Sequence, residues 1–217
     1  MTKPPSIDTD RPRENKTSLT RASIAQAALE LADEQGIKAV SARKLASRMG
    51  KTAMAIYRHF DNIEDVHVSM VELALTEVDA SPVPGERWDD TMRRTTRSIL
   101  DMYKRHENAN LLSISGAADS PSMRAHTQRI LNLHLAQGMP REVLRKAWGL
   151  IDAFLTGFSC GLLLDSRGNA SAHDEPWSDM TRNAYDDRSF HDGMEIIIAG
   201  IRAIAAPDAC EWRTPLD

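Results

Sequence analysis

Apolar residues recur at intervals of three and four along most of the chain, as they do in helices that bury one face. Before the turn-forming stretch SPVPG at 81–85, this pattern predicts helices over about 20–35, 41–49, 53–59 and 63–78. After it, the pattern predicts helices over about 88–105, 109–116, 122–137, 141–164 and 189–205, with a polar loop at 166–188. Strand-like alternation and internal repeats are not evident in the sequence, so we expect an all-α fold.

The second and third predicted helices are short and are separated by a turn that contains Gly50. Two short helices joined by a glycine turn are typical of a helix-turn-helix unit, whose second helix fits the major groove of DNA. Ala53, Ile56 and Phe60 form the stripe that would hold this second helix against its neighbours. The sequence therefore predicts a DNA-binding unit in its first third.

Charge is distributed unevenly between this unit and the remaining chain. Residues 1–60 contain 11 Lys+Arg and 6 Asp+Glu, whereas residues 61–217 contain 16 and 25, within a formal net charge of −4. A basic end on an acidic body favours a polyanionic partner at one end only.

The residues that commonly carry chemistry show no catalytic or metal-binding pattern. The two cysteines, Cys160 and Cys210, cannot form a four-thiolate zinc site, and they fit a reducing cytosol. HExxH, GxSxG, GxGxxG and phosphate-loop motifs do not occur in the sequence. We therefore expect neither an enzyme nor a metal or cofactor. The sequence has no signal-peptide pattern and no run of about 18 apolar residues, which predicts a cytoplasmic protein without a membrane partner.

The segment LTRASIAQAALELADEQGIKAVSARKLASRMGKTAMAIYRHFDNIEDV at 19–66 resembles the N-terminal domain of TetR-type transcriptional regulators. The most specific parts are R-K-L-A-x-x-M-G and I-Y-R-H-F. Further along, ERWDD, LLLD and FHDGMEIIIAGI are similar to parts of the ligand-binding domain of the tetracycline repressor. The resemblance implies a helix-turn-helix domain at 19–66 and a ligand-binding and dimerisation domain at 67–217. Residues 1–18 are polar and rich in proline, which predicts a flexible basic arm.

The resemblance also implies which residues contact DNA. Arg43 matches a base-reading arginine, and Tyr57 and His59 match phosphate contacts. The whole expected set is Arg43, Lys51, Thr52, Ala53, Met54, Ala55, Tyr57, Arg58 and His59. The alternative for each is an ordinary solvated, core or capping residue.

The base-facing positions of the recognition helix differ from the usual chemistry of base readout. Ala53, Met54 and Ala55 have no hydrogen-bonding side chains, so they can read only thymine methyl groups. Arg43 is therefore expected to carry much of the direct specificity, and DNA shape to supply some of the rest. The lysine that the family usually carries at the start of the fourth helix is Ile63 here.

A ligand pocket is expected between the helices of the second domain, with apolar walls and a few polar anchors. The candidate residues are Thr95, Ile99, Met102, Ser113, Met123, Gln137, Trp148, Phe154, Phe158 and Asp165. Asp165 matches the carboxylate of the tetracycline repressor's magnesium site. The drug- and metal-binding positions of that repressor read as Asp79, Thr95 and Ser113 here, which predicts a different, metal-free, apolar or amphipathic ligand.

The helix at 141–164 is apolar on both sides and has a seam with steps of four and three. Together with the last helix, it could form a symmetric four-helix bundle with a second copy, the alternative being an intramolecular core. The expected interface is Leu144, Trp148, Ile151, Leu155, Phe158, Leu162, Met194, Ile197 and Ile201. Glycines expected to allow close approach are Gly157, Gly161, Gly193 and Gly200.

These features predict a homodimeric transcriptional repressor that a small apolar or amphipathic effector releases from its operator DNA. Two alternatives remain at this point. One is an architectural DNA-binding protein that senses no ligand, and the other is a dimeric small-molecule-binding module. Sequence-specific DNA binding and its response to ligands distinguish the three.

Overall fold

The computed structural model describes residues 19–114, 120–166, 184–205 and 211–216. Within these ranges the extended elements are helices, and one isolated antiparallel bridge joins Arg87 to Arg213. The predicted all-α fold is confirmed. The predicted arm and most of the expected polar loop lie outside the described residues.

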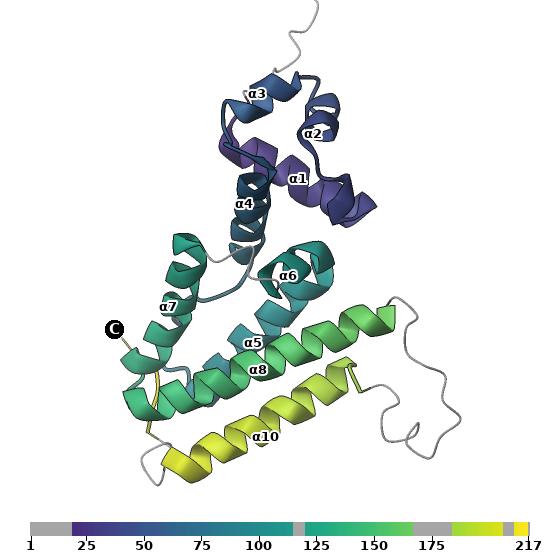
Figure 1. The fold of residues 1–217 in the computed structure, drawn as a ribbon. Helices are drawn as coiled ribbons and strands as arrows, with labels where there is room; N and C mark the ends of the chain where they lie inside the picture. Colours follow the sequence, from purple (N-terminus) through teal and green to yellow (C-terminus); the bar gives the residue numbers. More distant parts are fainter. Residues whose placement is uncertain (1–18, 115–119, 167–183, 206–210, 217) are drawn as a thin grey trace, which may run out of the picture.

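The first four helices form the upper part of the molecule in Figure 1. They are α1 (Arg21–Gln35), α2 (Ala42–Arg48), α3 (Ala53–Tyr57) and α4 (Ile63–Leu75), with the 3-10 helix η1 (Ile37–Ala39) after α1. Each α-helix begins at a side chain that accepts a backbone N–H of the first turn, which stabilises a helix start. These caps are Thr20, Ser41, Thr52 and Asn62.

The four helices enclose an apolar core. Ile24, Leu45, Ile56 and Met70, one from each helix, have 0 % exposed surface. The domain boundary expected between residues 66 and 67 falls inside α4, which packs along α1 and also contacts α6 and α7 of the lower part. α4 is therefore a shared element that joins the two parts of the molecule.

The lower part contains the longer helices. They are α5 (Trp88–Arg105), α6 (Glu107–Ile114), α7 (Pro121–Ala136), α8 (Arg141–Ser166) and α10 (Asp187–Ala205). Figure 1 shows α8 and α10 side by side at the base of the molecule. The sequence pattern identified all of these helices, with end positions that differ by less than one turn.

Residues 211–216, which we call the strap, lie against the start of α5. Trp88 N donates to the Trp212 carbonyl (3.2 Å) and Thr214 N to the Glu86 carbonyl (2.8 Å). The rings of Trp88 and Trp212 meet edge to face, with centroids 5.9 Å apart. Trp212 is only 7 % exposed, so the strap completes the core at this end of the domain.

α8 is long and apolar enough, by length and composition alone, to cross a membrane. The expectation that the sequence contains no segment apolar enough to span a membrane is therefore wrong as a statement about composition. In the protein, Leu144, Ile151, Leu155 and Phe158 of α8 are buried against neighbouring helices. The core helix of a globular domain has the same length and composition, so α8 is weak evidence for a membrane span.

Candidate nucleic-acid interface and small-molecule site

The turn between α2 and α3 sets the direction of the recognition helix. Gly50 has φ +63°, in the left-handed region that glycine adopts without strain. Lys51 N donates to the Ala46 carbonyl (2.8 Å), which closes the end of α2. The Thr52 hydroxyl then accepts Ala55 N (3.3 Å) and starts α3.

α3 has one buried and one exposed side. Ile56 is 0 % exposed and the following Phe60 is 2 % exposed, so this side is fixed to the core. Met54 is 68 % exposed and Tyr57 is 47 % exposed, at the opposite side of the helix. Residues three apart on a helix are neighbours, so Met54 and Tyr57 form one exposed patch, and exposed apolar patches mark interaction sites.

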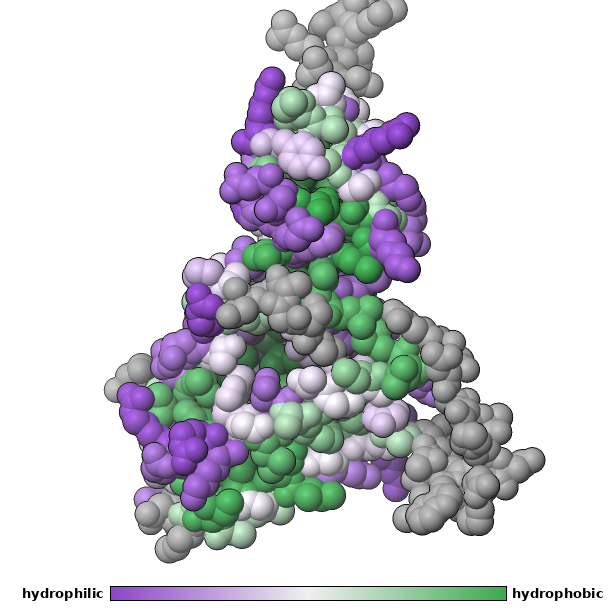
Figure 2. All heavy atoms as spheres, in the orientation of Figure 1, coloured by the Kyte–Doolittle hydropathy of each residue, from purple (hydrophilic) through white to green (hydrophobic). Residues whose placement is uncertain are grey.

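Positive charge surrounds this exposed side. Arg43, Lys51 and Arg58 are exposed, and within the described residues they form neither an ion pair nor a side-chain hydrogen bond that would occupy them. Arg48, by contrast, pairs with Glu34 on α1 through both terminal nitrogens, each at 2.7 Å. Figure 2 shows hydrophilic residues gathered over this end of the molecule. The three unpaired cations are therefore available to phosphate or to base edges.

The end of the recognition helix is fixed by Arg21 of α1. Its guanidinium donates to the His59 carbonyl (2.7 Å), pairs with Asp65 of α4, and lies 4.2 Å from the Phe60 ring centroid. This pairing lowers the pKa of Asp65, mainly through the Arg21 hydrogen bonds. His59 is half-buried beside the exposed Tyr57. The remaining predicted DNA residues, Thr52, Ala53 and Ala55, lie on α3 or its cap.

A polar cluster joins this unit to the lower helices at the α5–α6 corner. His106 Nδ1 lies 2.7 Å from an Asp33 carboxylate oxygen of α1, and His106 Nε2 lies 3.0 Å from Glu77, just after α4. The ring thus has one nitrogen within hydrogen-bond distance of each carboxylate. Burial raises the pKa of Glu77, but hydrogen bonds from His106 and Arg105 outweigh it and bring the pKa below its usual range.

Asn108 of α6 adds to the same junction. Its amide nitrogen donates to the Ala32 carbonyl (2.8 Å), and its amide oxygen accepts Ile37 N (3.1 Å). The last turn of α1 is thus satisfied by a side chain from another domain. We call His106 and Asn108 together the clasp. A shift of α6 must move or break the clasp, which connects it to the DNA-binding unit.

The ten predicted ligand residues lie in several separate environments within the described structure. Thr95 is buried and its hydroxyl is hydrogen-bonded inside the protein. Gln137 is also buried, and its amide nitrogen donates to Thr91, but its amide oxygen has no partner within the described residues. Phe154 and Phe158 belong to an aromatic cluster with Phe190 (centroids 5.5 and 5.2 Å). Of the others, Ile99 and Met102 are core residues, Ser113, Met123 and Trp148 are half-buried, and Asp165 is exposed.

Gln137 has a structural role that the sequence did not reveal. Its amide nitrogen lies 2.6 Å from the Thr91 hydroxyl, 3.1 Å from the Thr214 hydroxyl and 3.2 Å from the Glu86 carbonyl. It therefore connects the end of α7 to α5 and the strap. The contact with the strap could not be predicted, because the sequence of the strap has no helical or strand pattern that would place it beside α7.

A cavity of about 140 Å³ lies between α5, α6 and α8. Asn110 is 2 % exposed, and its amide oxygen has no hydrogen-bond partner, although a buried acceptor without a donor is costly. Burial, followed by the nearby Asp152, raises the pKa of Tyr103 to about 12, so its hydroxyl stays a neutral donor. The cavity is lined by Tyr103, Lys104, Glu107, Asn110, Ser159, Leu162 and Leu163.

Most residues of the predicted dimer interface are buried within the single chain. Seven are at most 7 % exposed and two are half-buried, so they pack α8 against α10 and other helices of the same copy. Phe154 lies where a Cβ on Gly193 would be, and Tyr185 where a Cβ on Gly161 would be, so these glycines permit contacts within the chain. The exposed apolar residues of these two helices are Leu150, Leu164, Ile196 and Ile204.

These features define a helix-turn-helix DNA-binding protein with a second helical domain. Two family models match it: "Bacterial regulatory proteins, tetR family" over residues 24–69, and "Tetracyclin repressor-like, C-terminal domain" over residues 81–184. The chain belongs to the TetR family of regulators, and its second domain is of the tetracycline-repressor type.

Individual relatives agree with this assignment. The chain is 25 % identical to the transcriptional repressor DrrR1 of Streptomyces coeruleorubidus over 143 residues, which cover 65 % of this chain and 53 % of that protein. It is 25 % identical to the class A tetracycline repressor of Escherichia coli, over 85 % of this chain and 91 % of that one. The first curated relatives are thus matched over little more than half of their length.

Among solved structures, the fold is similar to that of ActR, a TetR family protein of Streptomyces coelicolor, in complex with actinorhodin. The TM-score is 0.70 with 25 % sequence identity, over 88 % of this chain and all of that one.

Proposed function

We propose that the protein is a homodimeric, ligand-responsive transcriptional repressor of the cytoplasm, which releases its operator DNA when a small apolar or amphipathic effector binds. The observation that carries this proposal is the exposed side of α3, where Met54 and Tyr57 stand in solvent beside unpaired cations. Curated relatives that are described as repressors, and ActR bound to actinorhodin, support it.

On DNA, Arg43 reads a guanine edge, Met54 contacts thymine methyl groups, and Tyr57 contacts the backbone. A bidentate arginine–guanine pair contributes about 1–3 kcal/mol of discrimination. Lys51 and Arg58, together with His59, add phosphate contacts that fix the register without reading sequence.

The effector acts through the cavity between α5, α6 and α8. Its volume of about 140 Å³ is below the roughly 300 Å³ of ordinary ligand pockets, so a ligand of drug size must displace α6 or α8. The unsatisfied Asn110 oxygen calls for an effector with a hydrogen-bond donor. Because the clasp is on the same α5–α6 corner, displacement of α6 alters the position of α1 and α4. Coupling of this kind is typically about 1–3 kcal/mol.

The second copy packs on the exposed apolar face of α8 and α10. A cleft of about 490 Å³ lies between these helices, and Leu150, Ile196 and Ile204 at its edges are 54 %, 74 % and 58 % exposed. Figure 2 shows apolar residues gathered at the base of the molecule, where these helices lie. In a twofold dimer this face of one copy packs on the same face of the other copy. The dimer then holds its two recognition helices about one DNA turn apart.

The test is operator binding measured by fluorescence anisotropy. Duplexes are selected from a random pool and measured against a scrambled duplex at about 150 mM salt, because electrostatic affinity depends on salt. We expect competitor-resistant binding, and about tenfold weaker binding for Arg43→Ala and for Tyr57→Ala. Arg145→Ala, which removes an exposed arginine of α8, is the charge-matched control. Equal affinity in all three variants would refute the assigned DNA face.

A further inference from the structure

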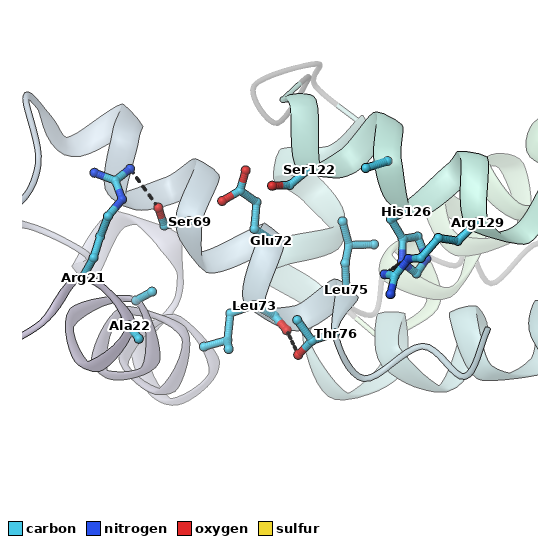
Figure 3. Close-up of a pocket in the computed structure, with 12 residues that line it drawn as sticks. Arg21, Ala22, Ser69, Glu72, Leu73, Leu75, Thr76, Ser122, His126 and Arg129 are labelled. Atoms are coloured by element: carbon cyan, nitrogen blue, oxygen red, sulfur yellow. Dashed lines mark hydrogen bonds between the residues drawn. The ribbon is translucent and has the colours of Figure 1, made fainter. Parts of the chain in front are cut away.

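A second cleft, of about 470 Å³, lies where the DNA-binding unit meets the lower helices (Figure 3). Its walls come from α1, α4 and α7, so it is separate from the cavity between α5, α6 and α8. Its size is within the range of small-molecule sites. Anything that fills it touches both parts of the molecule at once.

The walls of this junction cleft are mainly apolar. Ala22 and Ala25 of α1, Leu73 and Leu75 of α4, and Ala125 of α7 contribute them. Short side chains on α1 and α7 leave the space open. An apolar group placed there would be removed from water, which favours its binding.

One acidic side chain in the cleft has no counter-charge bound to it. Glu72 of α4 is half-buried and, within the described residues, makes neither an ion pair nor a hydrogen bond. Figure 3 shows its carboxylate and the Ser122 hydroxyl on facing sides of the cleft. The nearby Arg21 is already engaged by Asp65 and Ser69. Glu72 and Ser122 thus present acceptor oxygens to a cationic donor.

The opposite end of the cleft is different. Arg129 donates to His126 Nδ1 (2.9 Å), so the neutral His126 ring carries its proton on Nε2, which is buried and has no acceptor. Burial first, and the Arg129 charge second, lower the pKa of His126 and keep it neutral. Figure 3 shows Leu75 between this end and Glu72. The cleft is therefore acidic at one end, apolar in the middle and basic at the other.

We propose that the junction cleft is a second small-molecule site, and that it takes an amphipathic amine. The ammonium group binds the Glu72 carboxylate and the Ser122 hydroxyl, and the apolar body lies on Leu75 and Ala125. Its effect on operator binding rests on the proposed function, but its ligand binding does not.

An amine in this cleft joins α7 to α1 and α4. It therefore holds the DNA-binding unit in one orientation relative to the lower helices. Linkage requires that the amine and the operator change each other's affinity by the same factor. We expect a change of about fivefold or more, since coupling energies of this kind begin at about 1 kcal/mol.

The experiment compares three probes that differ only in the head group: octylamine, octanol and octanoate. Calorimetry on the full chain without DNA should detect octylamine binding, with octanol and octanoate at least tenfold weaker. Glu72→Gln should weaken octylamine binding tenfold or more. Glu64→Gln, an exposed position at the start of the same helix, is the matched control and should leave it unchanged.

A cleft-filling variant, Ala125→Trp, covers the case in which Glu72→Gln fails to fold, and it should abolish octylamine binding. Tighter binding of octanoate than of octylamine, or octylamine binding that survives both variants, would overturn the proposal. Octylamine binding that leaves operator affinity unchanged would refute the coupling. A protein that binds no specific DNA would refute the proposed function instead, while calorimetry would still decide the site.

Discussion

Gln137 connects α7, α5 and the strap through one amide group, and its replacement by methionine tests that role. Methionine keeps the length and most of the volume of the side chain, so little cavity is formed. The amide nitrogen has two hydrogens, shared among the Thr91 and Thr214 hydroxyls and the Glu86 carbonyl. At about 0.5–1.5 kcal/mol for each of two buried hydrogen bonds, Gln137→Met should cost about 2 kcal/mol.

Thermal and urea unfolding measure this cost. For a chain of this size about 1 kcal/mol corresponds to about 2–4 °C, so Tm should fall by about 4–8 °C. Gln128→Met is the matched control, because Gln128 is an exposed residue of the same helix whose one side-chain hydrogen bond among the described residues runs along the helix, to Asn132 (2.8 Å). It should change Tm by less than about 2 °C.

A double-mutant cycle with Thr214→Val isolates the contact between α7 and the strap. The two substitutions should be non-additive by about 1 kcal/mol, since both remove the same hydrogen bond. The reasoning is refuted if Gln137→Met is as mild as Gln128→Met, or if the cycle shows no coupling. A stable Gln137→Met protein that has lost only its effector response would instead restore Gln137 as a ligand anchor.

Three other positions lead to separate predictions. Burial lowers the pKa of His134 to about 4, so on acidification the unfolded chain takes up a proton before the folded one does, and the free energy of unfolding falls. In urea titrations at pH 7 and pH 5, His134→Leu should therefore lose about 2 kcal/mol less of this free energy than the parent protein. Asn108→Asp keeps the oxygen that accepts Ile37 N but loses the amide nitrogen that donates to the Ala32 carbonyl. Amide hydrogen exchange at the end of α1 should become about tenfold faster, and an unchanged exchange rate would contradict the role of the clasp. Ile196→Lys should convert dimer to monomer in sedimentation, whereas Leu216→Lys, equally exposed but outside α8 and α10, should not; a dimeric Ile196→Lys protein would exclude the proposed face.

Much of the fold could be predicted because its signals are local. Glycines at positive φ and capping side chains such as Ser41 and Thr52 mark helix ends directly in the sequence. The same is true of the recognition helix, where the buried Ile56 and the exposed Met54 follow from helical spacing alone. The turn chemistry fixes α2 and α3 through local contacts, whereas the end of α1 also depends on Asn108 of α6.

The interior of the second domain could not be predicted in the same way. A helix that is apolar on all sides, such as α8, does not reveal which side meets its own chain and which meets a partner. Leu155 and Ile197 are expected at the interface and are already buried within the single chain, although Ile197 also lines the cleft between α8 and α10, whereas the neighbouring Ile196 is exposed. Polar residues raise the same difficulty, since only the structure shows that the amide nitrogen of Gln137 donates to the distant Thr214, while the buried amide oxygens of Gln137 and Asn110 have no partner within the described residues.

The strap has a consequence for the order in which the chain can fold during synthesis. The DNA-binding unit is built from contacts among α1 to α4, and all of these residues leave the ribosome early. Trp88, at the start of α5, acquires its ring partner Trp212 and the strap hydrogen bonds only after α5 to α10 have also been made. The DNA-reading end can thus fold while translation continues, and the sensing end closes only afterwards. Until then the nascent chain carries a DNA-binding unit whose control domain is still open.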